Sequence, residues 1–482
     1  MTQGKSAPHI IETPNLQLVD GKFAFPGDDQ HEPLSLDDVF LLLASAESPE
    51  TWTISILKED LSSSNDNPWK LFFLRVPQDQ LPSEVRSQHS PLDKLPPHLL
   101  PGEGGSQVDV IVSTKSGTGK ALLFWQAVLQ PVLRLVYEEL DASSSAFATL
   151  QEQHVLVTES ADSVWDFGKT LGQQQQQQQQ PPGKKRTVIL LSGDGGAVDL
   201  LNAVGDTRLP SPPTIALLPL GTGNALFHSM HKPAYKQKPA LPPLAWGLHT
   251  LLQGADPFLP AFEATFPAGS NIIPPGLDTP PNRPVSTLRG VVVASYGFHA
   301  SIVYESDTSE HRVHGAKRFG MVAQELLVES HAYDARVSLL HASGGGAGNH
   351  HPVPLPRDKH AYVLTTLVSN LEQPFTISPA SKPLDGKLWT VHFGPLGPER
   401  TMEAMKAAYD GGRHVSLSWE DGERIGYDEV EEIDIEIRDE EERWRKVCID
   451  GTIVGVPRGG IVRVKRIPES AFRILISREA LH

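Results

Sequence analysis

The chain has 482 residues, of which 39% are hydrophobic and 21% are charged, so it is long enough for two or three domains with sizeable cores. Its formal net charge of −16 argues against nucleic acid as a main partner, because duplex binding depends on clustered Lys and Arg. The single cysteine, Cys448, excludes an intramolecular disulfide and a thiolate zinc site. The start of the chain lacks the layout of a secretory signal, and no run of about 18 apolar residues occurs. We therefore expect a cytoplasmic protein that associates peripherally with intracellular membranes.

Residues 1–105 are expected to form an N-terminal β-rich extension followed by a linker. Apolar, β-prone stretches at 36–44, 51–57 and 69–76 alternate with polar stretches. Between 91 and 106 the composition shifts to Pro, Gly and Ser, which is typical of a linker. The sequence gives no indication of what this region binds.

Residues 106–255 show the repeated pattern of strand, turn and helix. After the β-branched run 108–112, further strand-like runs occur at 154–157, 187–191 and 214–218, each before a turn and a helix candidate. This order predicts an α/β nucleotide-binding domain with a parallel sheet. Eight glutamines at 173–180 are predicted to form a disordered surface loop.

Residues 256–482 are expected to form a second domain that is mainly β and sandwich-like. Strand-like runs at 288–295, 361–368 and 388–393 are separated by Pro- and Gly-rich stretches. Ile433, Ile435 and Ile437 alternate with acidic residues, which predicts a half-buried strand.

Three glycine-rich turns follow three strand candidates of the α/β region, at 115–120, 192–196 and 219–224. The first is not a Walker loop, because its spacer is too short and Ala121 stands where a Ser or Thr would bind magnesium. Glycine lets the backbone approach a phosphate, and a following helix adds its positive end. One such loop alone would be an ordinary tight turn. Three at the carboxyl ends of neighbouring strands predict a nucleotide site.

Asp194 is the one carboxylate within these loops, flanked by Gly193, Gly195 and Gly196. It is either an aspartate that closes a local turn or a general base that orients a substrate hydroxyl. Phosphoryl transfer depends mainly on such positioning.

The second and third loops, SGDGGAVDLLNAV and LPLGTGNAL, resemble the diacylglycerol kinase catalytic family, most closely its sphingosine and ceramide kinase branch. The resemblance covers roughly residues 106–475. It implies a lipid kinase that uses ATP and Mg²⁺ bound to the ATP phosphates, with Asp194 as the catalytic base and Asp199 at the acidic position near the substrate. It also implies that a further set of residues lines the ATP phosphates and ribose: Ser113, Lys120, Thr158, Gly195, Gly221, Thr222 and Asn224.

The C-terminal half resembles the same branch. The segment SYGFHAS at 295–301 is similar to its substrate segment, which implies that Ser301 faces the lipid head group. Arg312 and Arg318 fall on the positions of two arginines that reach the ATP phosphates. Asp450 belongs to the late segment, which is expected to bind the nucleotide as part of a return to the α/β domain from about residue 447. Two departures are Ser301, where sphingosine kinases carry an aspartate, and Thr452, where the family carries a glutamate.

The resemblance favours a sphingoid long-chain base as the substrate, with diacylglycerol or ceramide as the alternative. A lipid substrate implies peripheral contact with a membrane. Two other readings stay open at this point: a soluble kinase of the wider fold group, such as an NAD kinase, and a catalytically silent nucleotide- or lipid-binding module. The second is motivated by Ser113, Ser192 and Thr452.

Overall fold

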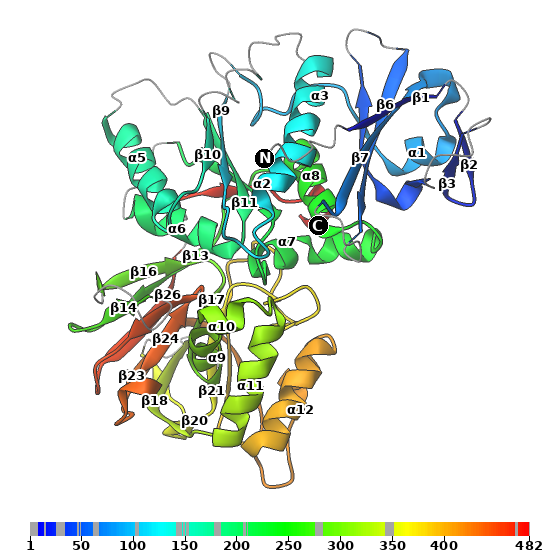
Figure 1. Ribbon diagram of the computed structural model, residues 1–482. Helices are drawn as coiled ribbons and strands as arrows, with labels where there is room; N and C mark the ends of the chain where they lie inside the picture. Colours follow the sequence, from blue (N-terminus) through cyan, green and yellow to red (C-terminus); the bar gives the residue numbers. More distant parts are fainter. Residues whose placement is uncertain are drawn as a thin grey trace.

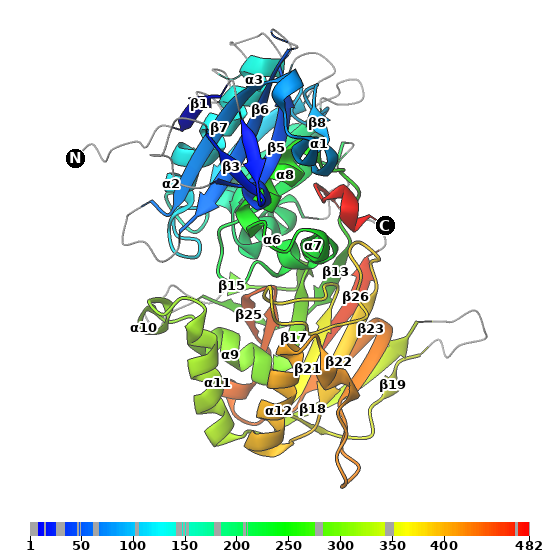
Figure 2. The same cartoon turned by 90° about the vertical axis from the view of Figure 1, so that its right-hand side faces the viewer.

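The computed structural model (Figures 1 and 2) contains an N-terminal unit, an α/β domain and a larger β domain that carries helices on one side. It describes residues 8–13, 16–25, 34–45, 48, 50–60, 67–101, 106–140, 147, 150, 154–177, 185–205, 209, 211–274, 283–342, 351–467 and 471–481. The predicted fold class, a parallel-sheet α/β domain followed by a mainly β domain, is confirmed.

The N-terminal unit contains a five-stranded sheet in the order β1-β7-β6-β5-β8 and a small sheet β2-β3-β4. Its elements are β1 (His9–Glu12), β2 (Gln17–Val19), β3 (Lys22–Ala24), β4 (Leu34–Ser35), β5 (Val39–Ala44), β6 (Thr51–Glu59), β7 (Trp69–Pro77), α1 (Ser83–Gln88) and β8 (Pro91–Leu92). The segment expected to be a linker is docked instead. β8 pairs with β5, and Leu99 accepts a hydrogen bond of 2.7 Å from the Tyr137 hydroxyl of the α/β domain.

The α/β domain is built on a five-stranded sheet, order β10-β9-β11-β12-β27, in which every neighbouring pair is parallel. Its strands are β9 (Ser106–Val112), β10 (Val155–Val157), β11 (Lys185–Ser192), β12 (Thr214–Pro219) and β27 (Arg473–Ile474). Its helices are α2 (Ala121–Phe124), α3 (Gln130–Leu140), α5 (Ser163–Gln177), α6 (Asp194–Val204), α7 (Ala225–Gln237) and α8 (Pro243–Gln253). The central strand β11 is apolar along most of its length because helices cover both faces of the sheet.

The polyglutamine prediction is wrong for its first part. Residues 173–177 continue α5, and residues 178–180 lie outside the described ranges. Glutamine has a good intrinsic helix propensity, so a run of it can extend a helix that packing has already started.

The β domain holds a sheet of 14 strands with antiparallel pairing throughout, and this sheet curls around its own core. Its strands are β13 (Ala261–Thr265), β14 (Asn271–Ile273), β15 (Arg283–Pro284), β16 (Thr287–Gly290), β17 (Val293–Gly297), β18 (Tyr333–His341), β19 (Val353–Pro354), β20 (Lys359–His360), β21 (Tyr362–Thr366), β22 (Leu388–Phe393), β23 (Gly426–Ile437), β24 (Lys446–Ile449), β25 (Thr452–Gly455) and β26 (Ile461–Ile467). Its helices are α9 (Phe298–Ser306), α10 (Ser309–Arg312), α11 (Lys317–Glu329) and α12 (Gly397–Tyr409).

The return of the chain to the α/β domain is later than expected. Residues from 447 to 467 contribute β24, β25 and β26 to the large sheet. Among the described strands after β23, only β27 joins the parallel sheet, by pairing with β12. Strand β26 pairs antiparallel with β23 over residues 461–465 and with β13 over residues 463–467. Only the short tail after residue 470 therefore reaches the parallel sheet, as the red segment in Figure 1 shows.

Candidate active site

The three glycine loops lie against one another at the carboxyl edge of the parallel sheet. A Cβ on Gly193 would lie 2.9 Å from the Cα of Gly221, and a Cβ on Gly117 would collide with the carbonyl oxygen of Leu220. The Gly193 N–H donates to Ser116 Oγ at 2.8 Å, which ties the first loop to the second. Backbones can approach this closely only without side chains, so the glycines are explained by loop-to-loop packing as well as by access for a phosphate.

Asn224, predicted to bind the nucleotide, holds its own loop together. It sits in the left-handed region with φ of 52° and precedes α7. Its side chain accepts the Gly221 N–H at 2.9 Å and donates to the Gly221 carbonyl at 3.1 Å. Asparagine suits this position because its short amide bonds the backbone locally and tolerates positive φ. In the structure it positions Gly221 and Thr222.

Asp194 is the first residue of α6 and is half-buried. Its two carboxylate oxygens accept the N–H groups of Ala225 at 2.8 Å and of Leu226 at 2.9 Å, in the first turn of α7. Burial raises the pKa of Asp194, while these backbone hydrogen bonds act in the opposite direction. The carboxylate thus joins the second loop to the third in a fixed orientation.

The remaining residues predicted around the phosphates lie at the same edge of the sheet. Thr158 Oγ1 accepts the Thr114 N–H at 3.0 Å, and the Ser113 N–H donates to the Leu191 carbonyl at 3.1 Å. Lys120 precedes α2 and is half-buried, as is Thr222, whereas Gly195 is exposed. Strands β9, β10 and β11 end together here, so their following turns meet.

Asp450 has a different surrounding from the one expected. Its carboxylate accepts the backbone N–H groups of Val291, Val292 and Val293, at the start of β17. Burial, together with the nearby Asp194 carboxylate, raises the pKa of Asp450 to about 7. Asp450 therefore clamps a turn of the β domain close to Asp194.

Arg312 and Arg318 converge on one carboxylate of the β domain. Arg312 makes two hydrogen bonds to Asp307, at 2.7 and 2.9 Å, and Arg318 Nη1 lies 3.5 Å from Asp307 Oδ1. The buried Nε of Arg318 has no hydrogen-bond partner among the described residues. The structure brings the two arginines together through Asp307, and their contact with the ATP phosphates stays a prediction.

Neither residue predicted to contact the substrate lines the large apolar cavity of the β domain. The Ser301 hydroxyl is buried against the Tyr333 hydroxyl at 2.8 Å. Asp199 lies on α6, where burial and the neighbouring Asp162 raise its pKa to about 6. The cavity is lined by helix positions 298, 299, 302 and 303, and residue 301 lies on the other face of α9. Contact of Ser301 with the substrate stays a prediction.

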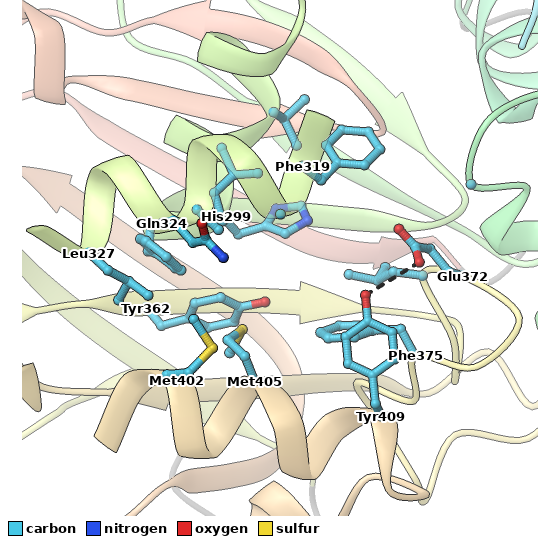
Figure 3. A pocket seen from close by; sticks show the side chains of 17 residues that line it. His299, Phe319, Gln324, Leu327, Tyr362, Glu372, Phe375, Met402, Met405 and Tyr409 are labelled. Atoms are coloured by element: carbon cyan, nitrogen blue, oxygen red, sulfur yellow. Dashed lines mark hydrogen bonds between the residues drawn. The ribbon is translucent and has the colours of Figure 1, made fainter. Parts of the chain in front are cut away.

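The apolar cavity has a volume of about 330 Å³ and lies between α9, α11, α12 and the loop after β21 (Figure 3). Its lining residues are Gly223, Phe298, His299, Ile302, Val303, Phe319, Gly320, Ala323, Gln324, Leu327, Tyr362, Leu371, Glu372, Phe375, Met402, Met405 and Tyr409. Gly223 belongs to the third glycine loop, so the cavity reaches that loop.

The segment SYGFHAS, in which the sequence singled out Ser301, contributes Phe298 and His299 to this cavity instead, and the contribution of α12 was not predicted. Met402, Met405 and Tyr409 are spaced three and four residues apart, which places them on one helix face. That spacing was a readable signal. Inside the cavity His299 is neutral, because burial lowers its pKa to about 4, and its Nδ1 lies 2.7 Å from Ser295 Oγ.

Within the described ranges, no group of three or more His, Cys, Asp or Glu side chains is arranged to hold a metal ion. None of the described helices combines the length and the hydropathy that a membrane crossing requires.

Residues 107–245 match the model of the family described as the diacylglycerol kinase catalytic domain. This part of the chain is therefore similar to a diacylglycerol kinase catalytic domain. The match indicates a lipid kinase, a phosphotransferase that uses ATP. The matched region starts in β9 and ends in α8, so it includes all three glycine loops.

Among solved structures, a diacylglycerol kinase from Bacillus anthracis str. Sterne is 14% identical, with a TM-score of 0.45, covering 78% of this chain and 98% of its own. A second structure, of a candidate diacylglycerol kinase from the same organism, is also 14% identical, with a TM-score of 0.47, covering 78% of this chain and 96% of its own. No curated protein matches the chain.

Proposed function

We propose that the chain transfers the γ-phosphoryl group of ATP to the primary hydroxyl of a sphingoid long-chain base. Diacylglycerol and ceramide are the alternative acceptors. The observation that carries this proposal is that Gly223, in the third glycine loop, also lines the apolar cavity. A lipid chain in the cavity would present its polar end to the loops that are proposed to hold the phosphates.

In the proposed reaction, the lipid hydroxyl oxygen forms a new bond to the γ-phosphorus, and the bond from that phosphorus to the bridging oxygen breaks. The hydroxyl proton passes to Asp194, and ADP leaves. Burial raises the pKa of the Asp194 carboxyl, which makes its carboxylate a better proton acceptor than an ordinary aspartate and suits this role. Its two backbone hydrogen bonds leave lone pairs for the hydroxyl proton.

Mg²⁺ is proposed to bind with the ATP phosphates, where it would spread their charge. The carboxylates near the loops, Asp194 and Asp450, already accept backbone N–H groups. Magnesium commonly keeps waters and phosphate oxygens as ligands with only one or two carboxylates, which this donor set can supply. Backbone N–H groups of the loops and Lys120 are proposed as the protein's own contacts to the phosphates.

The proposal also includes peripheral contact with a membrane, because an acyl chain must leave the bilayer to enter the cavity. Arg312 and Arg318 are proposed to turn toward the ATP phosphates when nucleotide is bound. Support for this comes from the Nε of Arg318, which has no hydrogen-bond partner in the described part of the chain, and from the planar guanidinium geometry that suits phosphate.

The test is Asp194→Asn, assayed with labelled ATP and, in separate reactions, sphingosine, diacylglycerol, ceramide and NAD. We expect turnover to fall by about 100- to 10,000-fold, the usual contribution of a positioned acid–base group. Binding of a nucleotide analogue should persist, which shows that the loops remain assembled. Activity above about a tenth of wild type would mean that Asp194 serves only as a cap for α7. A wild-type chain that binds ATP but phosphorylates no acceptor would be a silent binding module.

A further inference from the structure

Glu372 lies in a loop of the β domain that is fastened to the α/β domain. The loop follows β21, and its Asn370 exchanges two hydrogen bonds with Ser229 on α7, at 2.9 and 3.0 Å. Lys232, also on α7, donates to Asn370 Oδ1 at 2.9 Å. The Asn370 side chain in turn holds the carbonyl groups of Glu372 and Gln373. Glu372 therefore has a fixed position relative to α7 and the loop before it.

This position is at the end of the cavity that meets the third glycine loop. A Cβ on Gly223 would lie 3.1 Å from the carbonyl oxygen of Leu371, the residue before Glu372. In Figure 3, Glu372 and Tyr409 lie at one end of the cavity, and Leu327, Gln324 and Met402 lie toward the other. A ligand with a long apolar chain would thus have its polar end beside Glu372.

The Glu372 carboxylate has an unusual setting for a charged group. It is the one carboxylate among the described residues that line the cavity, and its neighbours there are mostly apolar. The Tyr409 hydroxyl donates to it at 3.5 Å, a long hydrogen bond, and no described Lys, Arg or His forms an ion pair with it. Burial raises the pKa of Glu372. A carboxylate placed in this way is stabilised by a cation that a ligand brings.

Resting on the lipid-kinase function proposed above, we infer that Glu372 determines specificity by binding the protonated amine of a sphingoid base. In such a lipid the amine and the primary hydroxyl are on adjacent carbons. An amine held by Glu372 would therefore leave the hydroxyl close to the glycine loop. Diacylglycerol offers ester oxygens, which can only accept hydrogen bonds and would face a carboxylate that also only accepts. The same group thus favours one lipid and disfavours the other.

The experiment compares Glu372→Gln with wild type, using sphinganine and a diacylglycerol in mixed micelles. Glutamine keeps the size of the side chain and removes its charge. We expect kcat/KM for sphinganine to fall tenfold or more, where tenfold corresponds to about 1.4 kcal/mol, and that for diacylglycerol to stay equal or rise. Glu325→Gln is the matched control, because Glu325 is exposed on α11 and does not line the cavity. It should behave as wild type with both lipids.

A second readout is the rise in melting temperature caused by sphinganine, which should be present in wild type and Glu325→Gln and absent in Glu372→Gln. Glu372→Ser supplies another neutral side chain in case the glutamine variant is unstable. An unchanged ratio between the two lipids, or an equal loss for both, would overturn the inference. A wild-type preference for diacylglycerol would overturn it too, and the lipid-kinase function would still stand. Failure of wild type on every lipid would instead count against the proposed function.

Discussion

At the scale of single residues, Asp450 shows how a side chain predicted to hold a ligand can hold the protein's own backbone. Its positive φ of 47° turns the chain after β24, and its carboxylate collects three successive N–H groups. Asparagine at this position would have only one acceptor oxygen, so it could accept hydrogen bonds from only some of these three N–H groups. Because the pKa of Asp450 is raised, the stability of the folded protein should depend on pH in a way that can be measured.

We predict that Asp450 makes the protein less stable as the pH rises from about 4 to about 7. Its folded-state pKa is about 7, against an ordinary value of 3.8. In this window the folded state holds a proton that the unfolded state releases, so a higher pH favours unfolding. Melting temperatures of wild type and Asp450→Asn should be compared across the window. The variant should have a lower melting temperature overall. Its melting temperature should fall less between about pH 4 and pH 7, because the part of the fall caused by titration of Asp450 is gone. Parallel curves would show that Asp450 does not titrate there.

The site could be predicted from sequence where a residue type is required by geometry. Gly117, Gly193 and Gly221 could be singled out because close approach to the backbone requires glycine, whether the approaching group is another loop or a phosphate. That Ser301 lies outside the lining of the apolar cavity could not be predicted, because the direction of a side chain depends on the helix on which it lies. Glu372 could not have been found, since its loop carries no motif and its place is set by Asn370 contacting a helix about 140 residues earlier.

At the scale of elements, α5 and α6 pack so closely that one of the two glycines on the facing side of α5 decides their distance. Gly168 and Gly172 lie on one face of α5, four residues apart, and both are buried. A Cβ on Gly168 would lie 2.7 Å from the Cβ of Ala203 on α6. A Cβ on Gly172 would lie 3.7 Å from the Cα of Val204, which is an ordinary contact. This packing also explains why helix α5 continues into the glutamine run, since its preceding turns are anchored.

We predict opposite effects for alanine at these two glycines. Gly168→Ala should lower the melting temperature, because overpacking costs about 1–3 kcal/mol and the rigid methyl of Ala203 cannot move aside. Gly172→Ala should be neutral or stabilising, since alanine is favoured over glycine within a helix by about 0.5–1 kcal/mol. Thermal unfolding of both variants checks this, and Ala203→Gly should rescue Gly168→Ala. Equal effects at the two positions would show that the helices are not in tight contact.

At the scale of the whole molecule, the N-terminal unit shares a core with the catalytic domain. One face of its five-stranded sheet packs against other parts of the same unit, and Leu74 is buried there. The other face, with Phe73, packs against α3 and α8. His249 on α8 donates to the Phe40 carbonyl at 2.9 Å, and Trp69 contacts Phe124 edge to face with ring centres 5.0 Å apart.

The sequence predicted a β-rich unit here but not its attachment. Strand β7 is apolar on both sides, as the pattern WKLFFLRV shows, and such a run predicts a strand covered on two faces without naming what covers them. The cover comes from helices that lie about 60 residues or more further along the chain, and that pairing is tertiary information. Figure 2 shows the unit in front of the α/β domain, away from the β domain.

A shared core predicts that damage inside the N-terminal unit spreads to the catalytic domain. Leu74→Ala removes a fully buried side chain from the unit's own core, at a cost of about 2–5 kcal/mol, and Phe73→Ala removes one from the shared face, at about 3–5 kcal/mol. In hydrogen exchange, both variants should speed the exchange of β6 and of α3 together, since cooperative units open as a whole. Strand β21, in the β domain, is the internal control and should keep its rate.

If Leu74→Ala accelerated β6 while α3 stayed protected, the N-terminal unit would be an independent module docked on the kinase. Its removal would then leave a folded catalytic domain, which the shared core argues against because α3 and α8 would lose their apolar cover.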